Sequence, residues 1–168
     1  NSIEQFEPSD WALLTQQRGV YLAEQQAAQV LRMLSGSKSD SSFGYRINNY
    51  QHCLQSATMA HRDGLDEEDV VVALLHDIGF ITAPDAHGEF AAALLGPYIS
   101  ERNHWMLRHH APFQNIHCPG LPGVELNARE QWRGHPHFDW TALFVANYVQ
   151  AAFDPEFDLL EAMARAAQ

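Results

Sequence analysis

The sequence predicts an all-α fold, and three observations lead to this prediction. No stretch alternates polar and apolar residues for long enough to indicate a β-sheet. Several stretches carry apolar residues at helical spacing, and they are bounded by helix-capping residues, glycine or proline. Apolar residues make up 46% of the 168 residues, which excludes a disordered chain. A chain of this length fits a single domain, residues 1–168, with its core between about residues 45 and 151.

The first helix is expected to run from about residue 10 to Leu34. Ser9 or Asp10 can cap its start. The polar segment 35–44 that follows is short enough to be a loop within one domain. The residues that we expect to form the buried stripe of this helix are Trp11, Leu14, Tyr21, Val30, Leu31 and Leu34.

Helix-breaking residues delimit the remaining helices. Pro112 is expected to end the fifth helix, and the prolines and glycines between residues 111 and 124 predict a long irregular loop. The tail after Pro155 is a candidate for one more helix. The other helices are expected at about residues 48–62, 66–78, 84–95, 101–110, 126–132 and 138–151.

The charge balance and the cysteine count limit which kinds of partner and which cellular location we expect. Ten Lys+Arg against 21 Asp+Glu give a net charge of -11, and Lys38 is the single lysine. Such a surface repels phosphate backbones, so we expect no nucleic-acid partner. No run of 18 apolar residues occurs, so we expect no membrane span. Cys53 and Cys118 form neither a CxxC pair nor a disulfide framework, which favours a cytoplasmic location.

The segment from Tyr50 to Gly79 holds the residues that point most directly to chemistry. An acidic start suits a helix N-terminus, and the apolar run from Val70 to Leu75 indicates a buried helix. This run delivers His76 and Asp77 to the core. Burying two ionisable side chains without partners costs several kcal/mol. A divalent metal ion is the partner that would satisfy both of them at once.

Histidine supplies the other candidate ligands. Ten histidines are an excess for this length, and histidine is the commonest metal ligand in proteins. A lone buried histidine is more often a hydrogen-bonded core residue, so only the combination favours a metal. Imidazole with carboxylate suits iron, manganese, zinc or nickel, and Asp77 could bridge two metals with its two oxygens. The five candidate ligands, on four expected helices, are His52, His76, Asp77, His87 and His110.

Several sequence blocks resemble the HD-domain superfamily of helical metalloproteins. His52 and the pair His76-Asp77 within ALLHDIG are similar to the motif of that superfamily. The chain more closely resembles the bacterial HD-domain proteins grouped with the mixed-valent di-iron oxygenases, such as myo-inositol oxygenase and the phosphonate-cleaving oxygenases. The blocks that carry the resemblance, in chain order, are HCLQSATMAHRDG, VVVALLHDIG, APDAHGEFAAALLGPYIS, HWMLRHHAPFQ, NAREQWRGHPHFD and FDPEFD.

This resemblance implies a five-helix HD-domain bundle, flanked by an N-terminal helix and C-terminal helices, that holds two iron ions on the five ligands. It implies an oxygenase that uses dioxygen to cleave a C–H bond and an adjacent C–C or C–P bond of a small polar substrate. His110 is preferred over His109 because it occupies the ligand position of the block HAPFQ. For the arginines, a solvated surface position is the alternative. The residues expected to contact substrate are Tyr45, Arg46, His109, Gln114, Arg129 and Arg133.

The chain also departs from the family pattern. The superfamily closes its first metal site with a late aspartate, and Val149 occupies the corresponding position here. His52, His76 and Asp77 would then be left as a two-histidine, one-carboxylate set with open positions, while Asp77, His87 and His110 hold the second metal. The residues that could replace the aspartate, only if the helix shifts, are Asn147, Asp154 and Asp158.

Two other functions stay open at this point. A metal-dependent phosphohydrolase is the commonest activity of the wider superfamily, but Phe80 replaces the lysine that often follows the HD pair as HDxGK. A non-catalytic HD domain is the third hypothesis, because Val149 cannot bind a metal. Metal content distinguishes the three hypotheses, since iron favours the oxygenase, other divalent metals favour hydrolysis, and no metal favours a non-catalytic role.

Overall fold

The computed structural model describes residues 2–160, and these residues contain helices but no β-strand. The all-α prediction is therefore confirmed. The α-helices are α1 (Pro8–Gly36), α2 (Asn49–Arg62), α3 (Glu67–Leu75), α4 (His87–Leu95), α5 (Glu101–Gln114) and α6 (Phe138–Phe144). Between them lie short 3-10 helices at Ile3–Gln5, Ser37–Ser39, Pro84–Ala86, Gly96–Tyr98, Asn115–His117 and Ala128–Trp132, and a π-helical segment follows α6 at Val145–Val149.

Capping side chains fix where the central helices begin. The Asn48 side chain accepts a hydrogen bond from the Gln51 amide at 3.0 Å, and the Gln51 side chain accepts one from the Asn48 amide at 3.2 Å, which is a capping box at the start of α2. Asp66 accepts from the Asp69 amide at 2.9 Å at the start of α3. The capping expected from the acidic run before α3 is thus present.

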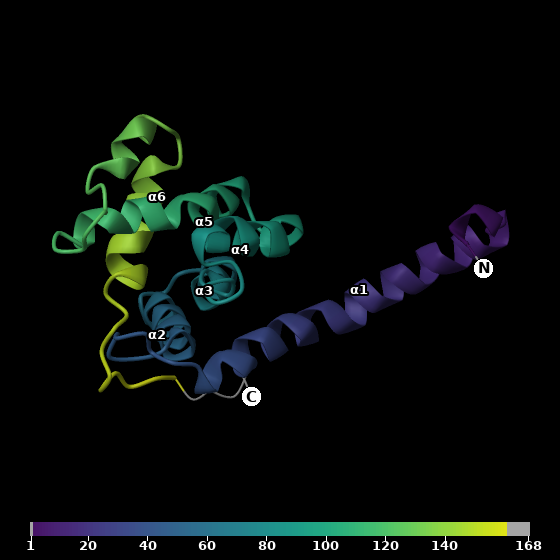
Figure 1. Cartoon of the computed structure of the whole chain (residues 1–168), viewed down its shortest axis with the longest axis horizontal. Coiled ribbons are helices and arrows are strands. Elements are labelled where there is room, and N and C mark those ends of the chain that lie inside the picture. Colours follow the sequence, from purple (N-terminus) through teal and green to yellow (C-terminus); the bar gives the residue numbers. More distant parts are fainter. Residues whose placement is uncertain (1, 161–168) are drawn as a thin grey trace.

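Helices α2 to α6 gather into a bundle, and α1 projects away from it (Figure 1). α2 packs along α3 and α4 packs along α5, and the bundle core contains buried apolar side chains from all five helices. The turn between α2 and α3 requires a positive φ at its centre, which Gly64 supplies at +78°. The candidate ligands lie in the first turns of α2 and α4, in the turn after α3 and near the end of α5.

A buried polar junction joins α3, α5 and α6. The amide of Asn103, which is fully buried, donates to Asp69 and to Glu68, each at 2.6 Å. Its oxygen accepts a hydrogen bond from the Trp140 indole at 2.9 Å. Arg102 forms an ion pair with Asp69 at 2.6 Å. Because every member has partners, the junction fixes the mutual position of the three helices.

Two expected helix ends are wrong. α5 continues through Pro112 to Gln114, since the proline lies in the last turn, costs one helical hydrogen bond, and is followed by the fully buried ring of Phe113. α3 ends at Leu75 instead of residue 78, and His76 and Asp77 lie in the turn that follows. This early end allows the two adjacent side chains to face the same centre.

The predicted buried stripe of α1 is only partly correct. Leu34 and Val30 are buried at 1% and 8% exposure, and Leu31 is half-buried. Trp11, Leu14 and Tyr21 are exposed at 47%, 47% and 49%, because the N-terminal half of the helix projects from the bundle (Figure 1).

The C-terminal region differs from the expected helices 126–132 and 138–151. The first is a 3-10 helix, and the second changes from α6 to the π-helical turn after Phe144. Residues 151–160 form turns and irregular structure, and the rest of the helix considered after Pro155 lies outside the described residues. None of the described helices combines the length and apolarity needed to cross a membrane.

Candidate metal centre

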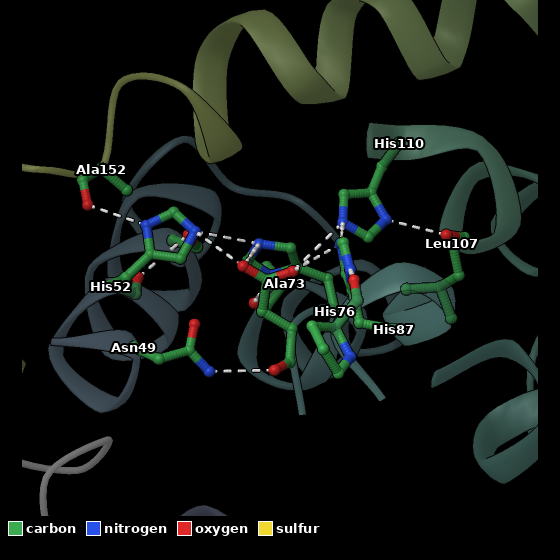
Figure 2. A network of polar contacts seen from close by, with 11 residues as sticks. Asn49, His52, Ala73, His76, His87, Leu107, His110 and Ala152 are labelled. Atoms are coloured by element: carbon green, nitrogen blue, oxygen red, sulfur yellow. Dashed lines mark hydrogen bonds and ion pairs between the residues drawn. The ribbon is translucent and has the colours of Figure 1, made fainter. Parts of the chain in front are cut away.

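Four imidazoles and one carboxylate meet between α2, α3, α4 and α5 (Figure 2). The Nε2 atoms of His52 and His76 are 3.0 Å apart, and those of His87 and His110 are 3.1 Å apart. Asp77 lies between the two pairs. Its Oδ2 is 3.6 Å from both His52 Nε2 and His76 Nε2, while its Oδ1 is 3.4 Å from His87 Nε2 and 3.1 Å from His110 Nε2. We call these five residues the His/Asp cluster.

The geometry divides the His/Asp cluster into two sets of three ligands. His52, His76 and Asp77 form one set, and Asp77, His87 and His110 form the other, with the ligand atoms of each set within 4.8 Å of one another. Because Asp77 belongs to both sets and presents a different oxygen to each, it is placed as a bridge between two ions. The structure thus brings together all five residues that the sequence suggested as ligands, and the cluster could hold metal ions.

Main-chain carbonyls fix the tautomer of every histidine in the cluster. The Nδ1 atoms of His52, His76, His87 and His110 lie 2.8–3.0 Å from carbonyl oxygens, which are those of Ala152, Ala73, Pro84 and Leu107 in the same order (Figure 2). A carbonyl oxygen only accepts, so each Nδ1 carries the hydrogen and donates it. In a neutral imidazole the inward-facing Nε2 is then a bare lone pair, which is the form that binds metals.

The interior of the cluster therefore contains acceptors and no donor. Burial lowers the pKa of His52 and lowers that of His76 to about 3, against the opposing effect of the Asp77 charge. Burial raises the pKa of Asp77, whereas positive charge on the imidazoles of His76, His110 and His52 and a hydrogen bond from His110 lower it, and the lowering effects are the larger. When these imidazoles are neutral, the ionised carboxylate faces only their lone pairs. A buried charge without a partner is unfavourable, so the residues fit a bound cation.

A close approach of α4 and α5 brings His87 to His110. A Cβ atom added at Gly88 would lie 2.6 Å from the Leu107 carbonyl oxygen and 3.3 Å from that of Arg108. Only glycine leaves room for two helix backbones at this separation. Leu107 is also the residue whose carbonyl orients His110. The same contact therefore sets both the spacing of the helices and the direction of one imidazole.

Val149 stands at the position where the sequence resemblance to HD domains would lead one to expect an aspartate. Val149 is fully buried in the core at the end of the π-helical segment, in which the Gln150 amide bonds to the Val145 carbonyl at 2.9 Å. The alternatives do not reach the cluster. Asn147 is exposed, Asp158 pairs with Arg62 at 3.1 Å, and Asp154 belongs to neither set of ligands.

A cavity of about 170 Å³ opens beside the His/Asp cluster, and His52, Asp77 and His87 form part of its wall. The other lining residues are aromatic, apolar or uncharged polar, and no lysine or arginine is among them. They are Ser41, Ser42, Phe43, Tyr45, Ile47, Asn48, Asn49, Phe80, Ala111, Gln114, Asn115, Cys118, Leu121 and Phe153. We call this space the cluster cavity.

The six residues expected to contact substrate fall into different places. Tyr45 and Gln114 line the cluster cavity. His109 stacks on Trp105 with ring centroids 4.1 Å apart and lines a second cavity of about 230 Å³, which also reaches His87.

The three arginines of that prediction line neither cavity. Arg46 is exposed. Arg133 pairs with Glu130 at 2.7 Å. Arg129 lies over the rings of Phe113 and Phe138, about 6 Å from their centroids.

Sequence reasoning did not single out three residues that shape the centre. Phe153 stacks on the His52 ring at 4.4 Å and on Tyr45 at 5.3 Å. Asn49 donates to the main-chain carbonyl of Asp77 at 2.9 Å. The third is Gly88. A glycine directly after a candidate ligand was a usable signal, whereas Phe153 lies about a hundred residues from His52 in sequence and gives none.

Comparisons with known proteins add no family assignment, since no family model matches the chain and a search of curated proteins finds no match. The resemblance to HD domains thus stays a prediction from the sequence blocks.

Proposed function

We propose that this chain is an HD-domain metalloenzyme that holds two iron ions and acts as an oxygenase. It would use dioxygen to cleave a C–H bond and an adjacent C–C or C–P bond of a small polar substrate. The observation that carries the metal is the His/Asp cluster, whose inward-facing atoms are all acceptors and which is divided into two sets by Asp77. The choice of iron and of oxygenation rests on the sequence blocks that resemble the di-iron HD proteins.

Within this proposal each cluster residue has a defined task. Asp77 would bridge the two ions, with His52 and His76 on one side and His87 and His110 on the other. The carbonyl bonds at Nδ1 keep the imidazoles oriented and increase their basicity. When bound, the iron ions would supply the redox chemistry that activates dioxygen and the Lewis acidity that orients a substrate oxygen.

The cluster cavity supports a small substrate. Its volume of about 170 Å³ suits a molecule of few heavy atoms, with the open side of His52, Asp77 and His87 at its inner end. Gln114, Asn48 and Asn49 provide amide groups in its wall that could hydrogen-bond a polar substrate. The rings that line it, including Phe80 and Phe153, would exclude water from the reacting groups.

One observation favours a second candidate, a non-catalytic HD domain. Val149 is buried where the superfamily places a ligand, so the first metal would have only the three side chains of its own set. In that case the domain would retain one metal or none and would serve to bind a ligand or a partner. A phosphohydrolase fits less well, because the cluster cavity has no lysine or arginine in its wall to bind a phosphate.

Metal analysis of the chain, purified without added metal under anaerobic conditions, tests the proposal. We expect about two iron ions per chain and a Mössbauer spectrum of a coupled iron pair. The Asp77→Ala variant should lose both ions, whereas Asp69→Ala, which removes another buried aspartate, should keep them. Zinc, manganese or nickel in place of iron would favour hydrolysis, and a metal-free wild-type protein would favour the non-catalytic role.

A further inference from the structure

Within the described residues 2–160, the N-terminal half of α1 packs against no other element. Every residue from 7 to 22 is exposed, and the helix extends away from the bundle (Figure 1). Its exposed apolar side chains include Leu13, Leu14, Val20 and Tyr21, at 46–55% exposure. Most of the stability of a helix in a protein comes from packing of its apolar face. A long helix with this face uncovered therefore indicates a partner outside the chain.

The uncovered face of α1 continues the face that is already packed. Leu34 is buried in the core, and Ala27, Val20 and Leu13 precede it at intervals of seven residues. Residues seven apart lie almost above one another on a helix, so these four form a single apolar stripe. The bundle covers only the C-terminal end of this stripe. At the N-terminal end of the stripe, Leu13 and Val20 are exposed.

The chain also presents an apolar groove of about 840 Å³ beside the packed end of α1. The groove runs between the C-terminal half of α1, the outer side of α3 and the end of α4. Its walls include Val30, Val71, Leu74 and Leu94, and Glu67 is the single acidic or basic residue apart from one histidine. An apolar groove that lies beside an uncovered apolar helix face indicates an interaction site.

We propose that a second copy of this chain covers both surfaces, in a two-fold dimer in which the N-terminal half of each α1 lies in the groove of the other. In a two-fold dimer the same surface of each copy contacts the other copy. Here the exposed stripe of one α1 would contact the groove of the second copy, and the stripe of the second copy would contact the groove of the first. Charge does not oppose this contact. Two copies with a net charge of -11 repel each other overall, but residues 8–22 contain one acid and one base, Asp10 and Arg18, and Glu67 is the single acid in the groove.

The area suits a weak dimer. The exposed helical residues 8–22 would span about 22 Å, and a helix is about 10 Å wide. Two helices in two grooves, with both contacting faces counted, bury about 900 Å² in total. This value lies below the range for stable specific interfaces, so the dimer should form at high protein concentration and dissociate on dilution.

Light scattering coupled to gel filtration tests the dimer on the full chain. We expect the wild-type protein, at high concentration, to elute with twice the mass of the 18.9 kDa chain. The double variant Leu13→Glu, Val20→Glu places charges on the stripe at residues that are exposed in the single chain, so folding should be preserved. We expect it to elute at half the wild-type mass, with an unchanged far-UV circular dichroism spectrum.

Gln25→Glu is the matched control, because it adds a charge to an exposed residue on the opposite side of α1 and should leave the dimer intact. A wild-type chain that stays monomeric throughout a concentration series would refute the proposal and leave another kind of partner for the stripe. A double variant that remains dimeric would also refute it, because the interface would then lie elsewhere.

Discussion

Replacing Asp77 by asparagine is the sharpest test of the His/Asp cluster. The change keeps the shape of the side chain but removes its charge and adds an NH₂ group. In the metal-free protein the carboxylate faces only imidazole lone pairs, at 3.1–3.6 Å. The asparagine amide would instead donate to one or two of these Nε2 atoms. We therefore expect Asp77→Asn to stabilise the metal-free protein, although it alters a buried ligand.

The magnitude follows from the burial of Asp77, whose side chain is 12% exposed. Relief of one buried, unsatisfied polar group is worth about 1–3 kcal/mol. For a chain of this length that corresponds to a rise of roughly 3–10 °C in melting temperature. With metal present the sign should reverse. Wild-type protein gains about 4 kcal/mol when free metal exceeds its dissociation constant a thousandfold, and the variant, without its bridging carboxylate, should lose most of this gain.

Thermal unfolding of chelator-treated and metal-loaded samples, with metal content checked by mass spectrometry, measures both effects. Asp69→Asn is the control. Asp69 is also buried, at 4% exposure against 8% for Asp77, but it already accepts from Asn103 and Arg102 at 2.6 Å, so its variant should be less stable with or without metal. If metal-free Asp77→Asn melts below metal-free wild type, the carboxylate is satisfied without a cation and the reasoning fails.

Three further substitutions probe the centre. His76→Ala removes a fully buried candidate ligand, so it should lower the metal content and should lower the free energy of unfolding by about 2–4 kcal/mol. Full metal content in this variant would show that His76 is not a ligand. Gly88→Ala places a methyl group 2.6 Å from the Leu107 carbonyl, so α4 must move from α5, and we expect lower metal content and a lower melting temperature in calorimetry; unchanged values would mean that the two helices separate without disturbing the ligands. Val149→Asp introduces a carboxylate at the position where the HD-domain resemblance predicts one, so metal content should rise relative to Val149→Asn. Equal contents in the two variants would remove a missing ligand as an explanation for low occupancy.

Local sequence was sufficient for most of the secondary structure. The acidic run that begins at Asp66 indicated the start of α3, and the expected range 48–62 matches α2, because helix-start and helix-stop signals act within a few residues. The apolar run before His76 correctly indicated burial of the HD pair. Local rules failed at Pro112, where burial of Phe113 outweighs one lost helical hydrogen bond.

Residue type also suggested the five ligands, because imidazole and carboxylate in buried helices need a partner wherever they lie. The sequence could not show that four carbonyl oxygens fix the tautomers, or that Phe153 covers His52. Three of the four carbonyl bonds are local, each from a histidine to the residue three positions earlier, and they follow from the backbone conformation. The bond of His52 to Ala152 and the stacking of Phe153 join segments about a hundred residues apart, and no local pattern encodes them.

The sequence by itself determined that this chain is helical, acidic and supplied with buried histidines around an aspartate. Only the tertiary structure decided that two pairs of imidazoles face the two oxygens of Asp77, that Arg46, Arg129 and Arg133 do not line the cluster cavity, and that α1 leaves the bundle. The physical reason is that helix formation depends on neighbours along the chain, whereas the position of a side chain in a site depends on how whole helices pack.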